Sequence, residues 1–225
     1  MKKSSKVLMF SVLLVFLVAG SASAAAILTL DDGMGNSVSI SDGGPGDLNL
    51  TVGVITYSAP LGSWFVNVST GFTKPALGGV NFPELDLNSA NMSSGPGTLT
   101  VTFEDDGFNL PDTFPGFRTD IGGTTKGTVS VTSDYDDTSL YDFGDASLLS
   151  TLGPLGPGVF AATGVALVNP DDPFALRLTA QITHTAAGQI TSFDTWLIPV
   201  PTPAAAWLLG AGLIGVVGIR RKFKN

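Results

Sequence analysis

The sequence contains no cysteine and only one histidine, His184. Without cysteine, neither a disulfide framework, nor a thiolate metal site, nor a cysteine nucleophile is possible. One histidine excludes the usual multi-histidine zinc sites and leaves a single imidazole for acid–base chemistry. The fold must therefore be held together by core packing, and carboxylates are the only abundant groups that could carry chemistry.

Basic residues are scarce between the two ends of the chain. Of the eleven Lys and Arg residues, three lie near the N-terminus and four near the C-terminus. The part between the ends contains the remaining four basic residues and all nineteen acidic residues, so its net charge is about −15. Such a surface repels phosphate backbones, and nucleic acid is not an expected partner.

Glycine and proline are abundant, with 28 and 14 residues. This composition favours short strands joined by tight turns, and no amphipathic stretch of helical length appears before residue 200. Period-two alternation of apolar and polar residues predicts about nine strands. The clearest are Leu48 to Val54, Trp64 to Val68, Leu99 to Phe103 and Leu176 to Ile182; the shorter ones are Leu28 to Leu30, Val38 to Ile40, Val129 to Val131, Val165 to Val168 and Ile190 to Trp196.

Clusters of Gly, Pro, Asp and Asn between these stretches predict turns. They lie at residues 41–46, 94–97, 120–123, 153–158 and 169–173, and the Asp-Asp-Gly sequences at 31–33 and 105–107 share the same turn chemistry. The spacing favours one antiparallel β-sandwich over residues 25–198, with jelly-roll connections as one arrangement that would fit, rather than a closed barrel.

The first 24 residues have the pattern of a secretory signal peptide. Three lysines precede an apolar stretch from Val7 to Ala19, and Ala22 and Ala24 supply the small residues that signal peptidase accepts. The apolar stretch is too short for a comfortable bilayer span, so an uncleaved anchor is the weaker alternative. We predict export, with cleavage after Ala24.

The C-terminal segment predicts a transmembrane helix. Residues 204–219 are free of charge, and as a helix they would rise about 24 Å, somewhat less than the hydrocarbon layer. A buried helix of the domain is the alternative, but a basic cluster follows at once: Arg220, Arg221, Lys222 and Lys224. By the positive-inside rule this cluster stays in the cytoplasm, which places the acidic body outside.

Before this helix stands the sequence Val200-Pro201-Thr202-Pro203. Together with the apolar helix and the basic end, it makes residues 199–225 resemble the sorting tail of PEP-CTERM proteins. The commonest motif of that family carries Glu where this chain has Thr202, although variants occur. The resemblance implies that residues 200–203 are recognised by an exosortase-like enzyme. It further implies transient anchoring in the inner membrane, with the body on the periplasmic side, and then release to the cell surface or extracellular matrix.

Catalytic residues are not expected in the body. His184 lies in a predicted strand on the same face as Ile182, without a nucleophile elbow nearby, so it is interpreted as a structural residue. Glycosidases need only two carboxylates, for which Glu84 with Asp86 and Glu104 with Asp106 have alternate spacing. That spacing is common in an acidic chain, and solvated side chains are the simpler interpretation.

A calcium or sugar site is more plausible than a catalytic pair of carboxylates. Asp134, Asp136 and Asp137 surround Tyr135, and hard cations take several oxygen ligands from such loops. The spacing is not that of an EF-hand, and a turn with solvated acids is the more usual explanation. Aromatic residues that could stack on sugars are also normal core residues in strands. These are Tyr57, Trp64, Tyr135 and Tyr141.

The sequence therefore predicts an exported structural or adhesive protein without enzymatic activity, associated with the cell surface or with an extracellular polysaccharide matrix. Its expected partners are signal peptidase, an exosortase-like enzyme, the membrane through residues 204–219, and extracellular polysaccharide; no cofactor is expected. The alternative is a carbohydrate-binding module assisted by calcium. An extracellular glycan hydrolase comes third.

Overall fold

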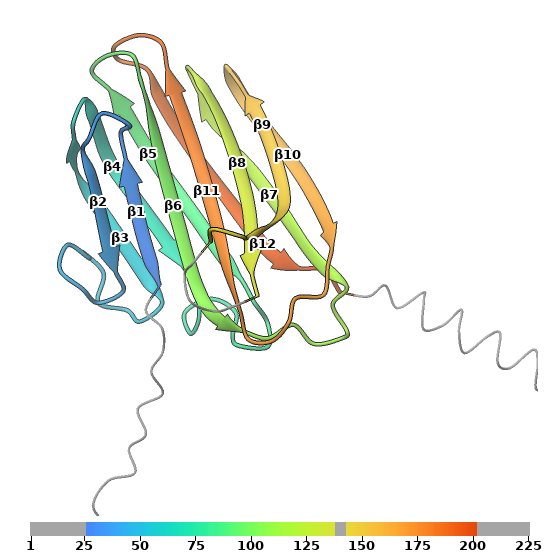
Figure 1. Ribbon diagram of the computed structural model, residues 1–225. Helices are drawn as coiled ribbons and strands as arrows, with labels where there is room; N and C mark the ends of the chain where they lie inside the picture. Colours follow the sequence, from blue (N-terminus) through green and yellow to red (C-terminus); the bar gives the residue numbers. More distant parts are fainter. Residues whose placement is uncertain (1–25, 138–142, 202–225) are drawn as a thin grey trace, which may run out of the picture.

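A computed structural model describes residues 26–137 and 143–201, which form two six-stranded antiparallel sheets packed face to face (Figure 1). Sheet A has the strand order β2-β1-β6-β11-β8-β9, and sheet B has the order β10-β7-β12-β5-β4-β3. The predicted all-β sandwich is thereby confirmed. The strands are β1 (Ile27–Asp31), β2 (Ser37–Ser41), β3 (Val54–Leu61), β4 (Trp64–Phe72), β5 (Leu85–Ser93), β6 (Gly97–Phe108), β7 (Gly116–Thr125), β8 (Thr128–Asp136), β9 (Ser147–Leu155), β10 (Gly158–Leu167), β11 (Phe174–His184) and β12 (Ile190–Pro199).

Several sequence predictions fall outside the described residues. These are the signal peptide with Ala22 and Ala24, Tyr141, and the tail from Thr202 and Pro203 through residues 204–219 to Arg220, Arg221, Lys222 and Lys224. Within residues 26–137 and 143–201, no helix is long and apolar enough to cross a bilayer.

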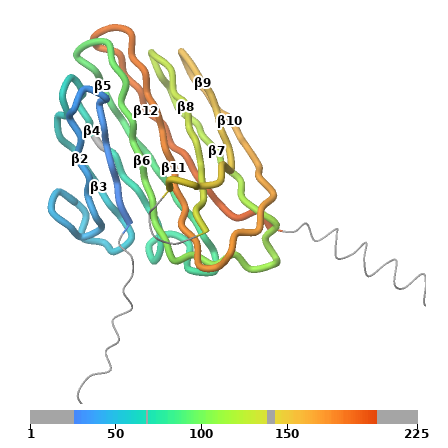
Figure 2. Tube along the Cα trace, in the orientation of Figure 1, coloured from blue at the N-terminus to red at the C-terminus, as the bar shows by residue number. Residues whose placement is uncertain are grey.

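Successive strands run in opposite directions along the sandwich (Figures 1 and 2). From β5 onward the chain crosses between the sheets at every connection except β8–β9. Because the strand direction alternates and the long loops all follow even-numbered strands, these loops lie at one end, called here the lower end, and the shorter turns lie at the other. Because β1 begins and β12 finishes at the lower end, both termini of the described body leave from there.

The core lies between the sheets and is built from the inward faces that alternation predicted. Leu176, Leu178, Ala180 and Ile182 of β11 are fully buried, as expected for a strand with one face in the core. Gly71 of β4 faces the ring of Phe103, and a Cβ atom at Gly71 would lie 2.4 Å from that ring. The absence of a side chain at this position lets the two sheets approach each other.

Some predicted elements are wrong. Leu48, Leu50 and Val52 are exposed in a loop rather than part of a strand. Asp47 Oδ1 accepts hydrogen bonds from the backbone amides of Asn49 and Thr56, both at 2.9 Å. Side-chain acceptors of this kind satisfy the backbone locally, in competition with a strand ladder.

Two predicted turns are also wrong, because they lie inside strands. Residues 120–123 are part of β7, and residues 105–107 are part of β6, where the β6–β11 register shifts at a bulge. Bulges and glycines occur within long strands, so turn composition alone could not distinguish the two cases. The alternation in β4 is likewise interrupted, by a register shift between Val66 and Val68.

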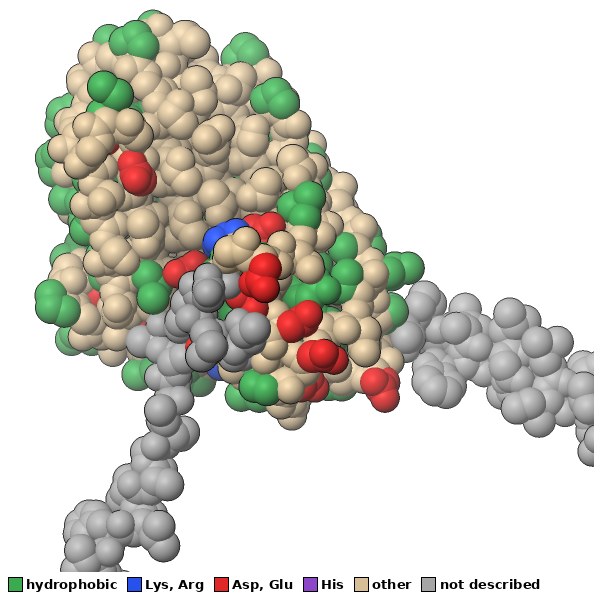
Figure 3. All heavy atoms as spheres, in the orientation of Figure 1, with side chains coloured by type: hydrophobic (Ala, Val, Ile, Leu, Met, Phe, Trp, Pro, Cys, Tyr) green, Lys and Arg blue, Asp and Glu red, His purple; other side chains and the backbone are tan. Residues whose placement is uncertain are grey.

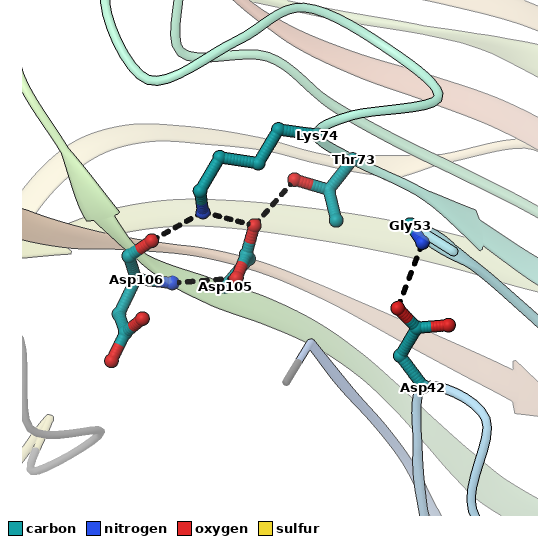
Figure 4. A network of polar contacts seen from close by, with 6 residues as sticks. All are labelled: Asp42, Gly53, Thr73, Lys74, Asp105 and Asp106. Atoms are coloured by element: carbon teal, nitrogen blue, oxygen red, sulfur yellow. Dashed lines mark hydrogen bonds and ion pairs between the residues drawn. The ribbon is translucent and has the colours of Figure 1, made fainter. Parts of the chain in front are cut away.

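A buried ion pair connects the sheets at the lower end (Figure 4). Lys74, just after β4, places Nζ 2.6 Å from Asp105 Oδ2 on β6 and also donates to the Asp106 carbonyl. Thr73 donates to the same Asp105 oxygen at 2.7 Å. Next to them, Gly53 donates to Asp42 at 2.8 Å, and a Cβ atom at Gly53 would lie 2.6 Å from the Thr73 carbonyl. These contacts fix the start of the loop that follows β4.

The two outer faces of the sandwich differ in composition. On sheet A, one cross-strand row consists only of hydroxyl residues: Ser39, Thr29, Thr102, Thr179, Thr132 and Thr151. Figure 3 views this side, where uncharged polar surface dominates and acidic side chains gather toward the lower end. The outer face of sheet B instead exposes Phe65, Met92, Ile190 and Trp196. Large exposed apolar groups on one face are typical of a binding surface.

Candidate functional site

The site is centred on Trp196, on the outer face of sheet B. In β12, Phe193, Thr195 and Leu197 point into the core, so Asp194 and Trp196 point outward. Trp196 is 44% exposed although its strand lies in the interior of the sheet. An aromatic ring held on a central strand and open to solvent is a rigid apolar platform.

Strand register places four residues in one row with Trp196. Asp86 of β5 is its direct partner on one side, and Asp120 of β7 is its partner on the other. Phe72 of β4 is opposite Asp86, and Thr163 of β10 is opposite Asp120. Since neighbouring strands lie about 4.8 Å apart, this row crosses roughly 19 Å of the sheet.

Hollows flank the Trp196 ring on both sides. One, of about 580 Å³, is lined by Phe72, Leu77, Asp86, Asn88 and Asp194 among others. The other, of about 470 Å³, lies toward β10 and has Asp120, Ala161 and Thr163 in its lining. Gly122 lines both hollows, and a Cβ atom placed there would meet nothing closer than the Phe160 carbonyl oxygen, at 3.8 Å. The missing side chain at Gly122 therefore helps to keep this surface open.

Asp86 has the most perturbed carboxyl of the site. Only 7% of the residue is exposed, and burial together with the nearby charge of Asp194 raises the pKa of Asp86 to about 7. Asp194 is the diagonal neighbour of Asp86, and a hydrogen bond between their side chains contributes to the rise. The Asn88 amide, 3.5 Å from Asp86 Oδ1, opposes it. Near neutral pH the Asp86 carboxyl therefore holds a proton for part of the time.

Asp120 differs from Asp86, because its charge is compensated. Arg118 Nε donates to Asp120 Oδ2 and Thr163 Oγ1 donates to Asp120 Oδ1, both at 2.7 Å. This pair is partly exposed, with side-chain exposures of 45% for Arg118 and 31% for Asp120. The Arg118–Asp120 pair therefore fixes the side chains on the β7–β10 side of the site and adds little net charge there.

The loop after β4 forms one rim of the larger hollow. Leu77 of this loop lines the hollow together with Phe72. Lys74, three residues earlier, is fixed by the buried ion pair with Asp105. The polar network at the lower end thereby positions the rim beside Asp86.

His184 is a core imidazole, as interpreted from the sequence. It is 1% exposed, and its Nδ1 and Nε2 each lie 2.8 Å from a hydroxyl, those of Ser93 and Thr191. Its ring lies 4.7 Å from that of Trp64, centroid to centroid. Burial lowers the pKa of His184. With Ser93 also buried, this arrangement connects the two sheets and has no access to substrate.

The paired carboxylates of the sequence analysis are not brought together as pairs. Asp86 pairs with Asp194 instead of Glu84, whose charge only adds to the rise of the Asp86 pKa. Glu104 is opposite Arg177 on the outer face of sheet A, away from the hollows. Asp106 is 7% exposed beside the Lys74 network.

The three candidate calcium ligands do not converge. Asp134 accepts hydrogen bonds from Arg177 at 3.2 and 3.3 Å, and Asp137 Oδ1 accepts from the Asp171 amide at 3.0 Å. Asp136 is 3% exposed. Within the described part of the chain, no group of three or more acidic or histidine side chains is arranged to hold a metal ion.

The candidate aromatic residues of the sequence do not include Trp196, which the structure exposes on sheet B. Trp64 is 1% exposed, and Tyr57 and Tyr135 pack against the core. The sequence did contain a signal for Trp196, since parity within Ile190 to Trp196 places it opposite to Phe193. The sequence contains no comparable signal for the contact between Asp86 and Asp194, because this contact depends on β5 and β12 being neighbours in the sheet.

Val200 and Pro201 close the described chain at the lower end. The Val200 amide donates to the Gly116 carbonyl at 2.8 Å, and Pro201 is exposed. The predicted recognition residues therefore begin directly where the sandwich finishes.

No protein-family model matches the sequence, and a search of curated proteins found no match. Among solved structures, a carbohydrate-binding module in complex with β-1,4-galactotriose is 10% identical, with a TM-score of 0.32 over 65% of this chain and 87% of that one. One described among carbohydrate-binding modules of the β-sandwich superfamily is 11% identical, with a TM-score of 0.35 over 77% and 84%. The enzymatically active domain of bacteriophage CBA120 tailspike protein 4 is 9% identical, with a TM-score of 0.35 over 62% and 20%. Similarity at this level assigns neither a family nor a ligand.

Proposed function

We propose that this chain is an exported, non-catalytic glycan-binding β-sandwich, and that it binds its glycan in the hollows around Trp196. The observation that carries the proposal is the half-exposed Trp196 ring on a central strand, with a hollow on each side and carboxyl and amide groups at its edges. This favours the carbohydrate-binding alternative over a purely structural role.

The chemistry of sugars fits this arrangement. A pyranose ring has an apolar face of C–H groups that can pack on an aromatic ring, and a periphery of hydroxyls that need hydrogen-bond partners. Trp196 supplies the apolar platform, while Asp194 and Asn88 supply acceptors and donors in the next outward-facing pair of the same two strands. A row that crosses five strands suits an extended chain of sugar units more than a single sugar.

The carboxyl geometry favours binding over hydrolysis. Glycosidases hold two carboxyl groups about 5 to 9.5 Å apart, which leaves room for the sugar and for water. Asp86 and Asp194 are close enough for a direct side-chain hydrogen bond, so they do not leave that room between them. We therefore assign no catalytic residue.

Export and sorting complete the proposal. We propose that signal peptidase removes residues 1–24 and that an exosortase-like enzyme recognises Val200, Pro201, Thr202 and Pro203. Both described ends leave the sandwich at its lower end, and the hollows lie on the outer face of sheet B near that end, beside the loop after β4. We propose that residues 204–219 first hold the chain in the inner membrane. After release, binding of matrix polysaccharide would give the adhesive role predicted from the sequence.

The test is affinity electrophoresis of residues 26–201, which contain all twelve described strands, through gels with embedded neutral polysaccharides. Trp196→Ala removes the platform, and Gly122→Leu fills both hollows without altering a carboxyl group. Phe65→Ala is the matched control, because Phe65 is an exposed aromatic residue that lines a different hollow of the same face.

We expect retardation of the wild type and of Phe65→Ala, and at least a tenfold loss of affinity in the other two variants. Retardation that persists in both Trp196→Ala and Gly122→Leu would overturn the site. Release of reducing sugar that disappears in Asp86→Asn would overturn the non-catalytic part of the proposal.

A further inference from the structure

We infer that the glycan bound around Trp196 is a cationic amino-sugar polymer, with one sugar ammonium group held between the carboxylates of Asp86 and Asp194. The inference rests on the proposed glycan-binding function and adds the chemical class of the glycan.

The charge of the hollows carries this inference. Among the described residues that line them, the acidic or basic ones are all aspartates: Asp86, Asp120 and Asp194. Arg118 compensates only Asp120, at 2.7 Å. Glu84 adds a further negative charge close to Asp86. The Asp86–Asp194 side of the larger hollow therefore presents negative charge beside an aromatic ring.

This negative charge predicts different affinities for three classes of polysaccharide. A polymer of uronic acids would place like charges next to the aspartates, which is costly at a partly desolvated interface. A neutral sugar can accept and donate hydrogen bonds but leaves the carboxylate charge uncompensated. A sugar ammonium group forms charge-assisted hydrogen bonds with both carboxylates, and these are stronger than neutral ones and strongest where water is excluded.

Binding of an ammonium group should also displace a proton. Asp86 is 93% buried in the free protein, and because its pKa is raised to about 7 it holds a proton at pH 6. An adjacent positive charge favours the ionised carboxyl. The neutral Asp86 carboxyl and the incoming ammonium group thus become a carboxylate–ammonium pair, and the proton passes to the buffer.

The experiment is isothermal titration calorimetry of residues 26–201 at pH 6, repeated in two buffers with different ionisation enthalpies. The probes are glucosamine hexamer, its fully N-acetylated form, galacturonic acid hexamer and hexalysine. We expect glucosamine hexamer to bind at least tenfold more tightly than the N-acetylated form, galacturonic acid hexamer not to bind, and hexalysine to bind more weakly than glucosamine hexamer. Binding should release the greater part of one proton per site, so the observed enthalpy should differ between the two buffers.

Variants locate the effect. Asp86→Asn should abolish proton release, and Asp194→Asn should weaken glucosamine binding about tenfold. Asp112→Asn, on the exposed loop between β6 and β7, removes a charge outside the hollows and should change neither quantity.

The outcomes separate this inference from the proposed function. If the N-acetylated form binds as tightly as glucosamine hexamer and binding depends on Trp196, the glycan site stands and the amino-sugar class falls. If hexalysine binds as tightly as glucosamine hexamer, the site selects cations rather than sugars and the inference is overturned. If no sugar probe binds, the inference is overturned, and the proposed function is decided separately by the retardation in polysaccharide gels.

Discussion

Trp196 and Asp86 are direct partners on neighbouring strands, one with its ring half exposed and the other with its carboxyl group buried. The two properties have a common origin. The Trp196 ring and the Phe72 ring lie on either side of Asp86 in one row, and apolar neighbours remove water from a carboxyl group. The platform that would pack on a sugar thus also perturbs the acid beside it.

The buried carboxyl of Asp86 should cost stability at alkaline pH. Because its pKa is raised from 3.8 to about 7, the folded protein holds a proton between these values that the unfolded chain has released. The free energy of unfolding therefore falls as pH rises through this window. We expect Asp86→Asn to stabilise the protein on the order of 2 kcal/mol at pH 8, and much less at pH 4. Urea denaturation at the two pH values measures this difference.

The companion variant Asp194→Asn removes the neighbouring charge that raises the Asp86 pKa. The fall in stability still begins near the unfolded-state pKa of 3.8, but the pH at which it ends, which is set by the folded-state pKa of Asp86, should move to a lower value. A gain in Asp86→Asn that is equal at pH 4 and pH 8 would contradict the assigned perturbation.

Removing the Lys74 ammonium group should strongly destabilise the sandwich. Asp105 would be left as an unpaired buried charge, with a side-chain exposure of 2%. We expect Lys74→Met to lower the free energy of unfolding at pH 7 by about 3–5 kcal/mol. The loss should shrink as pH falls, because a protonated Asp105 no longer carries the charge. Arg118→Met, which breaks the exposed pair with Asp120, is the control and should cost about 1 kcal/mol or less. Equal losses in the two variants would contradict the buried character of the Lys74 pair.

The sequence predicted the class of fold because the inward faces of its strongest strands alternate clearly. The alternation at Leu99 to Phe103 and at Leu176 to Ile182 has its counterpart in β6 and β11. The exposed Leu50 misled the prediction, since a side chain's burial depends on whether its backbone joins a ladder, and here Asp47 satisfies the backbone instead.

The site was less accessible to sequence analysis, because it is assembled across strands. Asp86 and Asp194 are more than a hundred residues apart, and they meet only because β5 and β12 are neighbours in sheet B. Alternation gives the face on which a residue lies but not the strand beside it. For the same reason, the sequence suggests Glu84, two residues away, as the partner of Asp86 rather than Asp194.

His184 should make the protein less stable under mildly acidic conditions. Burial lowers its pKa below the ordinary value of 6.5, so the unfolded chain binds a proton that the folded one does not. The free energy of unfolding should therefore fall as pH drops below about 6.5. The stability difference between wild type and His184→Asn should be larger at pH 7.5 than at pH 5.5, as measured by thermal unfolding. A difference that grows toward acidic pH would mean that the folded state holds His184 charged.

Calcium removal should leave glycan binding unchanged. Asp134 is engaged by Arg177 and Asp137 by the Asp171 amide, so these oxygens already have partners. We expect glucosamine hexamer to bind with the same dissociation constant in about 1 mM EDTA, which removes free calcium, and in about 1 mM calcium chloride. Weaker binding in EDTA that Asp134→Asn reproduces would instead support the calcium-assisted alternative.

Fluorescence quenching tests the central claim most directly. Residues 26–201 contain two tryptophans, Trp64 at 1% exposure and Trp196 at 44%, so acrylamide should quench mainly Trp196. We predict that saturating glucosamine hexamer protects the emission from acrylamide, and that Trp196→Phe leaves a buried emission that neither acrylamide nor sugar changes. Saturable binding of the sugar, measured by calorimetry, that leaves Trp196 fully open to acrylamide would contradict the account.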